Sequence, residues 1–129
     1  MKLPPYADWL ALTIEQSDAP PGLAPILAMP FSARVLGRPG FLHGGALGGL
    51  LEMAAVLALH DALGDDAARV KPVNVTIDFM RGGREKTTRA QGRVTRLGTR
   101  IANVEATAWQ DDRDVAIAVA RMNYRLVRG

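Results

Sequence analysis

The chain has 129 residues, of which 48% are hydrophobic, and 16 Lys and Arg against 13 Asp and Glu give a net charge of +3. This length and hydrophobicity predict a single folded domain over residues 1–129 and exclude a disordered protein. The absence of cysteine excludes disulfides, and with two histidines and a small charge we expect no metal site, no cofactor and no nucleic-acid partner.

The N-terminal 22 residues predict a short helix followed by a loop. Apolar residues at helical spacing run over about residues 6–16, and the Asp-Ala-Pro-Pro-Gly segment at residues 18–22 ends the helix. Pro4 and Pro5 stand where a signal peptide would have its apolar run, so we expect a cytoplasmic protein.

The next segment, residues 23–35, is apolar but contains Pro25 and Pro30, which predicts a short or irregular pair of strands. The Gly-Arg-Pro-Gly segment at residues 37–40 has the composition of a loop. The chain up to residue 40 is therefore expected to hold only short elements.

A long apolar helix follows, beginning at His43-Gly44-Gly45 and ending near residues 63–66. It is long enough to cross a membrane, but it contains Glu52, His60 and Asp61. A carboxylate in the middle of a lone spanning helix is costly, so we expect this helix to be buried in protein, with no membrane partner.

From residue 71 onward the period of the hydrophobic residues changes from helical to two, as in half-buried strands. Four strands are expected, over residues 73–79, 87–97, 99–110 and 115–127, with turns at residues 81–84, 98 and 111–114. The residues expected to face inward on the last two strands are Ala102, Val104, Ala106, Ala108, Ala116, Ala118, Ala120, Met122, Tyr124 and Leu126. The helix and the strands together predict an α+β fold.

The long helix must be covered on most sides, because it is apolar around most of its circumference. A curled sheet would cover one side, and Gly48 and Gly49 would allow close approach, with ligand contact as the alternative reason for these glycines. The chain leaves little to cover the remaining side, so we expect a second copy to do so.

Glu52 is the most informative single residue. Its neighbours are apolar, and no Lys or Arg lies within a turn of it on the same helix. Burying an unpartnered carboxylate is costly, so its position favours a functional role. The alternative is that Glu52 reaches an interface or solvent and pairs with an arginine of the sheet.

The His43-Gly44-Gly45 segment supplies a second candidate element. Free N–H groups and the helix dipole at a helix start favour an approaching oxygen, and glycines leave room for it at two donors. This is the composition of an oxyanion site, with an ordinary flexible helix start as the alternative. His43 could either hold the loop by hydrogen bonds or contact substrate.

These two elements are too far apart to act together within one chain. Nine residues separate His43 from Glu52, about 13 Å along the axis and on nearly opposite helix faces. Two antiparallel copies would bring the acid of one copy to the glycine N–H of the other. We therefore predict an active site across a dimer interface.

The segment Gly40-Phe41-Leu42-His43-Gly44-Gly45, followed by Leu50 and Glu52, resembles the signature of hotdog-fold acyl-CoA thioesterases of the phenylacetate-pathway (PaaI-like) type. Residues 73–81 and 97–102 are similar to the same family, and the resemblance covers residues 35–126. It implies a long central helix wrapped by a curved antiparallel sheet, assembly as homodimers or homotetramers, and an acyl-CoA substrate.

The resemblance also implies the roles of the site residues. The backbone N–H of Gly44 would polarise the thioester carbonyl, and Glu52 would act as nucleophile or activate a water. Two positions depart from the family pattern, because Gly37 stands where many relatives have Asn, and Pro72 where they often have Ser or Thr. The candidates to replace these polar groups are Asn74 and Thr76.

The remaining candidates concern substrate binding. Those for the acyl site are Leu47, Met53, Phe79 and Met80, and Gly45 is a further substrate-binding candidate at the helix start. Arg81 and Arg84 are the favoured donors to the phosphates of CoA, with a solvated strand edge as the alternative for each. The other basic candidates are Lys86, Arg96 and Arg100.

Three functions are compatible with these observations. The first is hydrolysis of aromatic or short- to medium-chain acyl-CoA thioesters by Glu52 and the helix start. The second is a non-catalytic acyl-CoA-binding or sensing protein of the same fold, suggested by the missing polar residues at positions 37 and 72. The third is a hydratase or dehydratase of acyl thioesters, which would use His43 and Glu52 together.

Overall fold

The computed structural model describes residues 3–15 and 24–128 and has the α+β architecture that the sequence predicts. In chain order the elements are α1 (Pro5–Trp9), β1 (Thr13–Glu15), β2 (Ile26–Met29), a 3₁₀ turn (Ala33–Val35), α2 (Gly44–Leu63), β3 (Arg69–Phe79), β4 (Thr88–Leu97), β5 (Ile101–Trp109) and β6 (Ala116–Val127).

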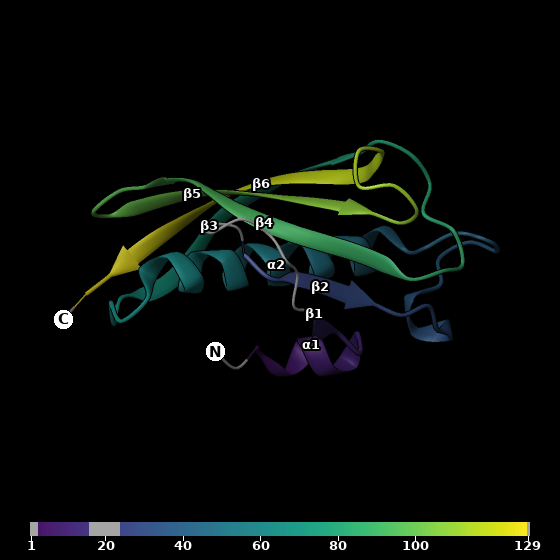
Figure 1. The fold of residues 1–129 in the computed structure, drawn as a ribbon, viewed down its shortest axis with the longest axis horizontal. Helices are drawn as coiled ribbons and strands as arrows, with labels where there is room; N and C mark the ends of the chain where they lie inside the picture. Colours follow the sequence, from purple (N-terminus) through teal and green to yellow (C-terminus); the bar gives the residue numbers. More distant parts are fainter. Residues whose placement is uncertain (1–2, 16–23, 129) are drawn as a thin grey trace.

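One antiparallel sheet of six strands lies over the long helix α2, as Figure 1 shows. The strand order is β1-β2-β4-β5-β6-β3, so β1 and β3 are the edges of the sheet. Register shifts mark bulges in β3, β4 and β6, which help the sheet to curve. Because α1 lies on the side of α2 away from the sheet (Figure 1), the long helix is central, as expected.

The sheet approaches α2 closely because its inward residues are small. The residues of β5 and β6 predicted to face inward are buried, apart from Ala116, which is half-buried. Gly92 of β4 makes the closest approach: a Cβ atom at this position would overlap the carbonyl oxygen of Ala54 and lie 2.8 Å from the Cβ of Ala58. The packing of sheet on helix therefore depends on the missing side chain at position 92.

The two helix glycines have different neighbours. A Cβ atom at Gly48 would lie 3.2 Å from Ile77 of β3, whereas one at Gly49 would lie 2.6 Å from Tyr6 of α1. The prediction that both glycines allow close approach of the sheet is thus confirmed for Gly48 and wrong for Gly49. Gly49 instead makes room for α1 on the opposite side of the helix.

The predicted helix over residues 6–16 is wrong in its second half. α1 ends at Trp9, Ala11 adopts a φ of 56°, and Thr13–Glu15 forms the edge strand β1 against β2. Two β-branched residues, Thr13 and Ile14, suit a strand, and pairing with β2 outweighs the helical spacing of so short a segment. Residue 16 and residues 18–22 lie outside the described residues.

The predicted strand pair in residues 23–35 is one strand. β2 pairs with β1 on one side and β4 on the other, and residues 33–35 form a 3₁₀ turn. Pro30 follows the end of β2, where a proline, which has no N–H to donate, does not continue a ladder. Residue 23 lies outside the described residues.

The strand predicted over residues 73–79 is present but is not half-buried. β3 is an edge strand bonded only to β6, and Val73, Val75 and Phe79 are 60%, 41% and 56% exposed. Val75 and Phe79 lie on the helix side of the sheet, opposite Met122 and Ala118, but no described element covers them fully. The alternating pattern identified the strand correctly and overestimated its burial in one chain.

The helix α2 confirms the predicted bounds, and Gly64 with a φ of 57° follows its last residue. Of the helices in the described ranges, it is the one long and apolar enough to cross a membrane, and 67% of that stretch is buried inside the fold.

Replacement of Gly92 by alanine tests the close approach of sheet and helix. We expect Gly92→Ala to lower the free energy of unfolding by about 2 kcal/mol, because the backbone of α2 must move away from the new methyl group. Urea denaturation measures this change. The control Arg93→Ala, on the outward face of the same strand, should change stability by less than about 0.5 kcal/mol; equal effects of the two substitutions would contradict the packing described here.

Candidate active site

His43 caps the start of α2. Its Nδ1 atom accepts a hydrogen bond of 2.9 Å from the backbone N–H of Gly45, and its own backbone N–H donates to the Val35 carbonyl at 2.8 Å. A Cβ atom at Gly45 would lie 2.9 Å from His43 Nδ1, so this cap requires glycine at position 45. Of the two alternatives for His43, the geometry supports the one in which it holds the loop.

Gly44 presents the free donor at the helix start. The N–H of Gly45 is occupied by His43, whereas that of Gly44 has no acceptor among the described residues. The helix dipole adds partial positive charge at this position. The two donors expected from the sequence are therefore reduced to one, the N–H of Gly44.

A cavity of about 500 Å³ opens beside Gly44, with the loop before α2 and the connection after β3 as its walls. A hydrogen bond of 2.9 Å from the N–H of Leu42 to the Gly83 carbonyl joins these two walls. The predicted substrate-binding residues that line this cavity are Leu47, Phe79 and Arg81; Gly45 and Met80 do not line it.

Two arginines stack on one phenylalanine at the rim of this cavity. The guanidinium carbons of Arg38 and Arg84 each lie 4.3 Å from the centre of the Phe41 ring, a geometry in which the ring stabilises the positive charge. Arg84 was predicted as a phosphate donor, whereas Arg38, which lines the cavity, was not. The sequence signal that could have identified Arg38 was its position in the Gly-Arg-Pro-Gly loop, just before the His-Gly-Gly motif.

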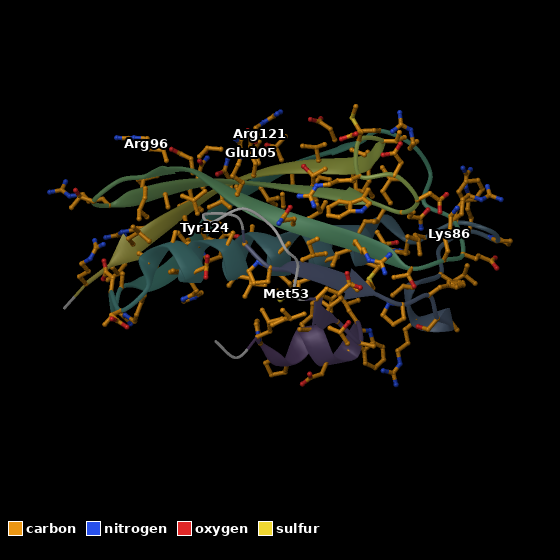
Figure 2. The ribbon with its side chains drawn as sticks, viewed as in Figure 1. Met53, Lys86, Arg96, Glu105, Arg121 and Tyr124 are labelled. Carbon is orange, nitrogen blue, oxygen red and sulfur yellow. The ribbon has the colours of Figure 1, made fainter. Side chains whose placement is uncertain are left out.

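The other basic candidates lie elsewhere. Lys86 forms an ion pair with Asp111, and Arg96 and Arg100 line a separate hollow at the turn between β4 and β5. Figure 2 shows Arg96 and Lys86 toward opposite ends of the molecule. Among the predicted basic residues, Arg81 and Arg84 are the two that lie at the helix-start cavity or its rim.

Glu52 lies in a second, smaller cavity of about 200 Å³. Its walls come from α2, β3 and β6, and the lining residues are Glu52, Met53, Val56, His60, Val70, Pro72 and Tyr124. Glu52 is half-buried, and in the described part of the chain no sheet arginine and no other side chain pairs with its carboxylate. The carboxylate is therefore available to a ligand in the cavity.

Tyr124 is a polar group of this cavity that the sequence identified only as an inward-facing residue. Its hydroxyl donates a hydrogen bond of 3.2 Å to Met122 Sδ. Burial, and to a lesser extent the charge of Glu52, raise the pKa of Tyr124, so the phenol keeps its proton at neutral pH. The sequence did contain a signal for this residue, because Tyr124 is the one polar side chain in an inward row of β6 otherwise made of alanine, methionine and leucine.

The two residues considered as replacements for the missing polar groups point away from this cavity. Asn74 lies opposite Asn123 and accepts a hydrogen bond of 2.8 Å from its side chain, and Thr76 lies opposite the exposed Arg121. Both positions belong to the outward face of the sheet, which Figure 2 shows at Arg121. Asn74 and Thr76 therefore do not supply polar groups to Glu52 within one chain.

The Gly44 cavity and the Glu52 cavity share no lining residue. Gly44 and Glu52 are eight residues apart, about 12 Å along one helix. Between residues 46 and 60, the positions that are not fully buried are Gly48, Glu52, Val56 and His60. Their spacing of four places them along one stripe of α2, beside the exposed edge strand β3.

Comparisons with known proteins identify the family of this chain. The family model of the thioesterase superfamily matches residues 39–117, more than half of the chain. No match is found among curated proteins.

Several solved structures are similar to this chain. A phenylacetic acid degradation-related protein from Ralstonia eutropha JMP134 is 25% identical, with a TM-score of 0.79 over 97% of this chain and 92% of that one. A Chromobacterium violaceum protein is 31% identical, with a TM-score of 0.76 over 96% and 84%. A Bacillus halodurans protein determined with CoA is 17% identical, with a TM-score of 0.81 over 96% and 79%, a likeness of fold alone.

Substitution of His43 tests its role as the cap of α2. We expect His43→Ala to lower the free energy of unfolding by about 1 kcal/mol, because the N–H of Gly45 loses its acceptor. His43→Asn should cost less, since an asparagine side-chain oxygen can accept the same bond. Urea denaturation compares the three proteins, and an equal loss for alanine and asparagine would argue against the cap.

Proposed function

Because the chain belongs to the thioesterase superfamily and has the hotdog fold, we propose that it hydrolyses acyl-CoA thioesters at a site formed by two copies of the chain. The observation that carries this proposal is an unpaired carboxylate, Glu52, and a free helix-start donor, Gly44, that open into separate cavities of one protomer.

The chemistry follows from these two groups. The N–H of Gly44 in one protomer donates to the thioester carbonyl oxygen, where the helix dipole also stabilises the developing negative charge. Glu52 of the partner subunit attacks the carbonyl carbon, or removes a proton from the water that does. The C–S bond then breaks, and CoA leaves as a thiol after taking up a proton. Where Glu52 is the nucleophile, water then cleaves the anhydride between Glu52 and the acyl group and regenerates the carboxylate. In both routes water supplies one oxygen of the acid product.

The edge strand β3 connects the two half-sites. Phe79, at one end of β3, lines the Gly44 cavity, while Val70 and Pro72, toward the other end, line the Glu52 cavity. If two β3 edges pair in antiparallel fashion about a two-fold axis near Val75, Phe79 of each copy lies beside residues 71 and 72 of the other. Each Gly44 cavity then meets the Glu52 cavity of its partner.

This pairing also covers what one chain leaves exposed. The apolar side chains of Val73, Val75 and Phe79 are more than two-fifths exposed, and an edge strand presents unpaired backbone groups to a second strand. A homodimer would bury these apolar side chains and pair these backbone groups. Further association of dimers would give a tetramer.

The CoA moiety is assigned to the Gly44 cavity. Arg38 and Arg81 line it and Arg84 lies at its rim, which gives positive charge for phosphate groups. Stacking on Phe41 holds Arg38 and Arg84 in place before a ligand arrives. The Bacillus halodurans protein of the same fold was determined with CoA, which supports this choice of ligand.

The acyl group is assigned to the Glu52 cavity. Its volume of about 200 Å³ exceeds that of the roughly 150 Å³ engineered cavity known to hold benzene. Met53, Val56 and Val70 give it apolar walls. One aromatic ring or a short to medium aliphatic chain fits such a space.

A non-catalytic acyl-CoA-binding protein is the second candidate. Neither Gly37 nor Pro72 carries a polar side chain, although many similar thioesterases have one at each place. Such a protein would bind the same ligands without cleaving them.

Release of free thiol from aromatic, short-chain and medium-chain acyl-CoAs tests the catalytic proposal. We expect turnover by the wild-type protein and a fall of at least two orders of magnitude in kcat for Glu52→Gln, because the amide is neither a nucleophile nor a base. The matched control is Glu105→Gln, an acid on the outward face of the sheet that pairs with Arg93.

Each outcome of that assay has a separate meaning. Acyl-CoA binding without thiol release from any substrate supports the binding protein. Release that Glu52→Gln leaves unchanged keeps the thioesterase and removes Glu52 from the mechanism.

Mixing two inactive variants tests whether the site is shared. Gly44→Pro removes the N–H donor while keeping a residue that suits the first position of a helix, and Glu52→Gln removes the acid. Each homodimer should be inactive, whereas subunit exchange should restore about one quarter of wild-type activity, since half of the dimers then hold one intact site. Thiol release after mixing measures the recovery.

Gly44→Ala is the control for this experiment. It keeps the N–H, and its Cβ atom would make only ordinary contact with Phe79 at 3.5 Å, so it should remain active. Mixed dimers that form but stay inactive would place both groups in one chain.

A further inference from the structure

The hydroxyl of Tyr124 has no strong hydrogen-bond acceptor among the described residues. The residue is 3% exposed, and Figure 2 shows its side chain on the helix side of the sheet. Within the described residues, its hydroxyl donates only to the sulfur of Met122, which is a weak acceptor. Buried hydroxyl groups usually bond to stronger acceptors, so this donor is incompletely satisfied.

Glu52 is the complementary group, because its carboxylate lacks a hydrogen-bond donor among the described side chains. Its carboxylate can accept several hydrogen bonds, and no described side chain donates to it. Both groups line the same cavity, and the charge of Glu52 acts on the phenol. An incompletely satisfied donor and an unpaired acceptor therefore share one small space.

The other walls of this cavity offer few donors. β3 contributes Val70 and Pro72, and Pro72, directly opposite Tyr124 in the strand register, has no donor in its side chain or its backbone. From α2, the other titratable group is His60, eight residues or about 12 Å further along the helix than Glu52. Tyr124 is thus the donor that faces Glu52 from the sheet.

We propose that Tyr124 is the positioning residue of Glu52, donating its hydroxyl hydrogen to the carboxylate in place of Met122 when substrate occupies the site. A hydrogen bond from a neutral phenol to a carboxylate is charge-assisted, orients the carboxylate and favours its ionised form. The inference rests on the proposed role of Glu52 in thioester hydrolysis. It adds a second residue that acts through Glu52 without contacting the reacting carbon.

Tyr124→Phe tests this role, because it removes one oxygen atom and keeps the ring that fills the core. We expect kcat for a cleaved acyl-CoA to fall about tenfold, with KM changed by less than about threefold. The acid limb of the profile of kcat against pH, which reports the enzyme–substrate complex, should move to higher pH, because the ionised acid loses a donor that stabilises it. Tyr6→Phe, which alters the other tyrosine of the chain on α1, is the control and should match the wild type in both respects.

Several outcomes would overturn the inference. One is a Tyr124→Phe protein with wild-type kcat and an unmoved acid limb. Another is a fall in kcat with no movement of the acid limb and a lowered melting temperature, which would make Tyr124 structural. If the wild-type protein cleaves no acyl-CoA, the proposed function fails and this inference with it, whereas loss of activity in Glu52→Gln but not in Tyr124→Phe removes Tyr124 alone.

Discussion

The structure depends on the burial of one helix that is apolar on nearly every side. α2 can be enclosed only by a surface that comes very near, and the sheet achieves this with alanine and with Gly92 against the backbone at Ala54. α1 covers the opposite side, where Gly49 makes room for it. The sheet and α1 leave one stripe of the helix partly exposed to solvent, and Glu52 lies on that stripe. The position of the acid is thus a consequence of how the helix is packed.

The same helix separates the two chemical groups of the site. Its first residue provides the free N–H, and its third turn provides the carboxylate, so a rigid α-helix keeps them about 12 Å apart. A flexible loop could close that distance, but a helix enclosed by a sheet cannot bend to do so. Within one chain the two groups therefore cannot meet at one substrate atom, and β3 is the surface through which a second copy is proposed to bring them together.

Long periodic segments were predictable from the sequence, and short ones were not. The bounds of α2 and the inward rows of β5 and β6 follow from patterns sustained over nine or more residues. The segment around Thr13 was predicted wrongly as helix, because the conformation of a three-residue strand depends on its pairing with a distant strand, β2. His43, Gly44 and Glu52 could be named as candidates from the sequence, whereas the nearness of Tyr124 to Glu52 depends on strand register and helix rotation, which no local pattern encodes.

The bulge in β3 has a consequence for the proposed pairing of two copies of the chain. The pairing of β3 with β6 shifts between Pro72 and Asn74, and Pro72 lacks the N–H that a neighbouring strand would use. A regular edge therefore runs from residue 74 to residue 79, and residues 71 and 72, which lie beside Phe79 of the partner subunit in the proposed dimer, are beyond the interruption. A strand that slides along this edge loses hydrogen bonds at once, and a slip of one residue would turn every side chain to the other face. In the proposed dimer, the interruption at Pro72 would thus limit the registers in which two β3 edges can pair.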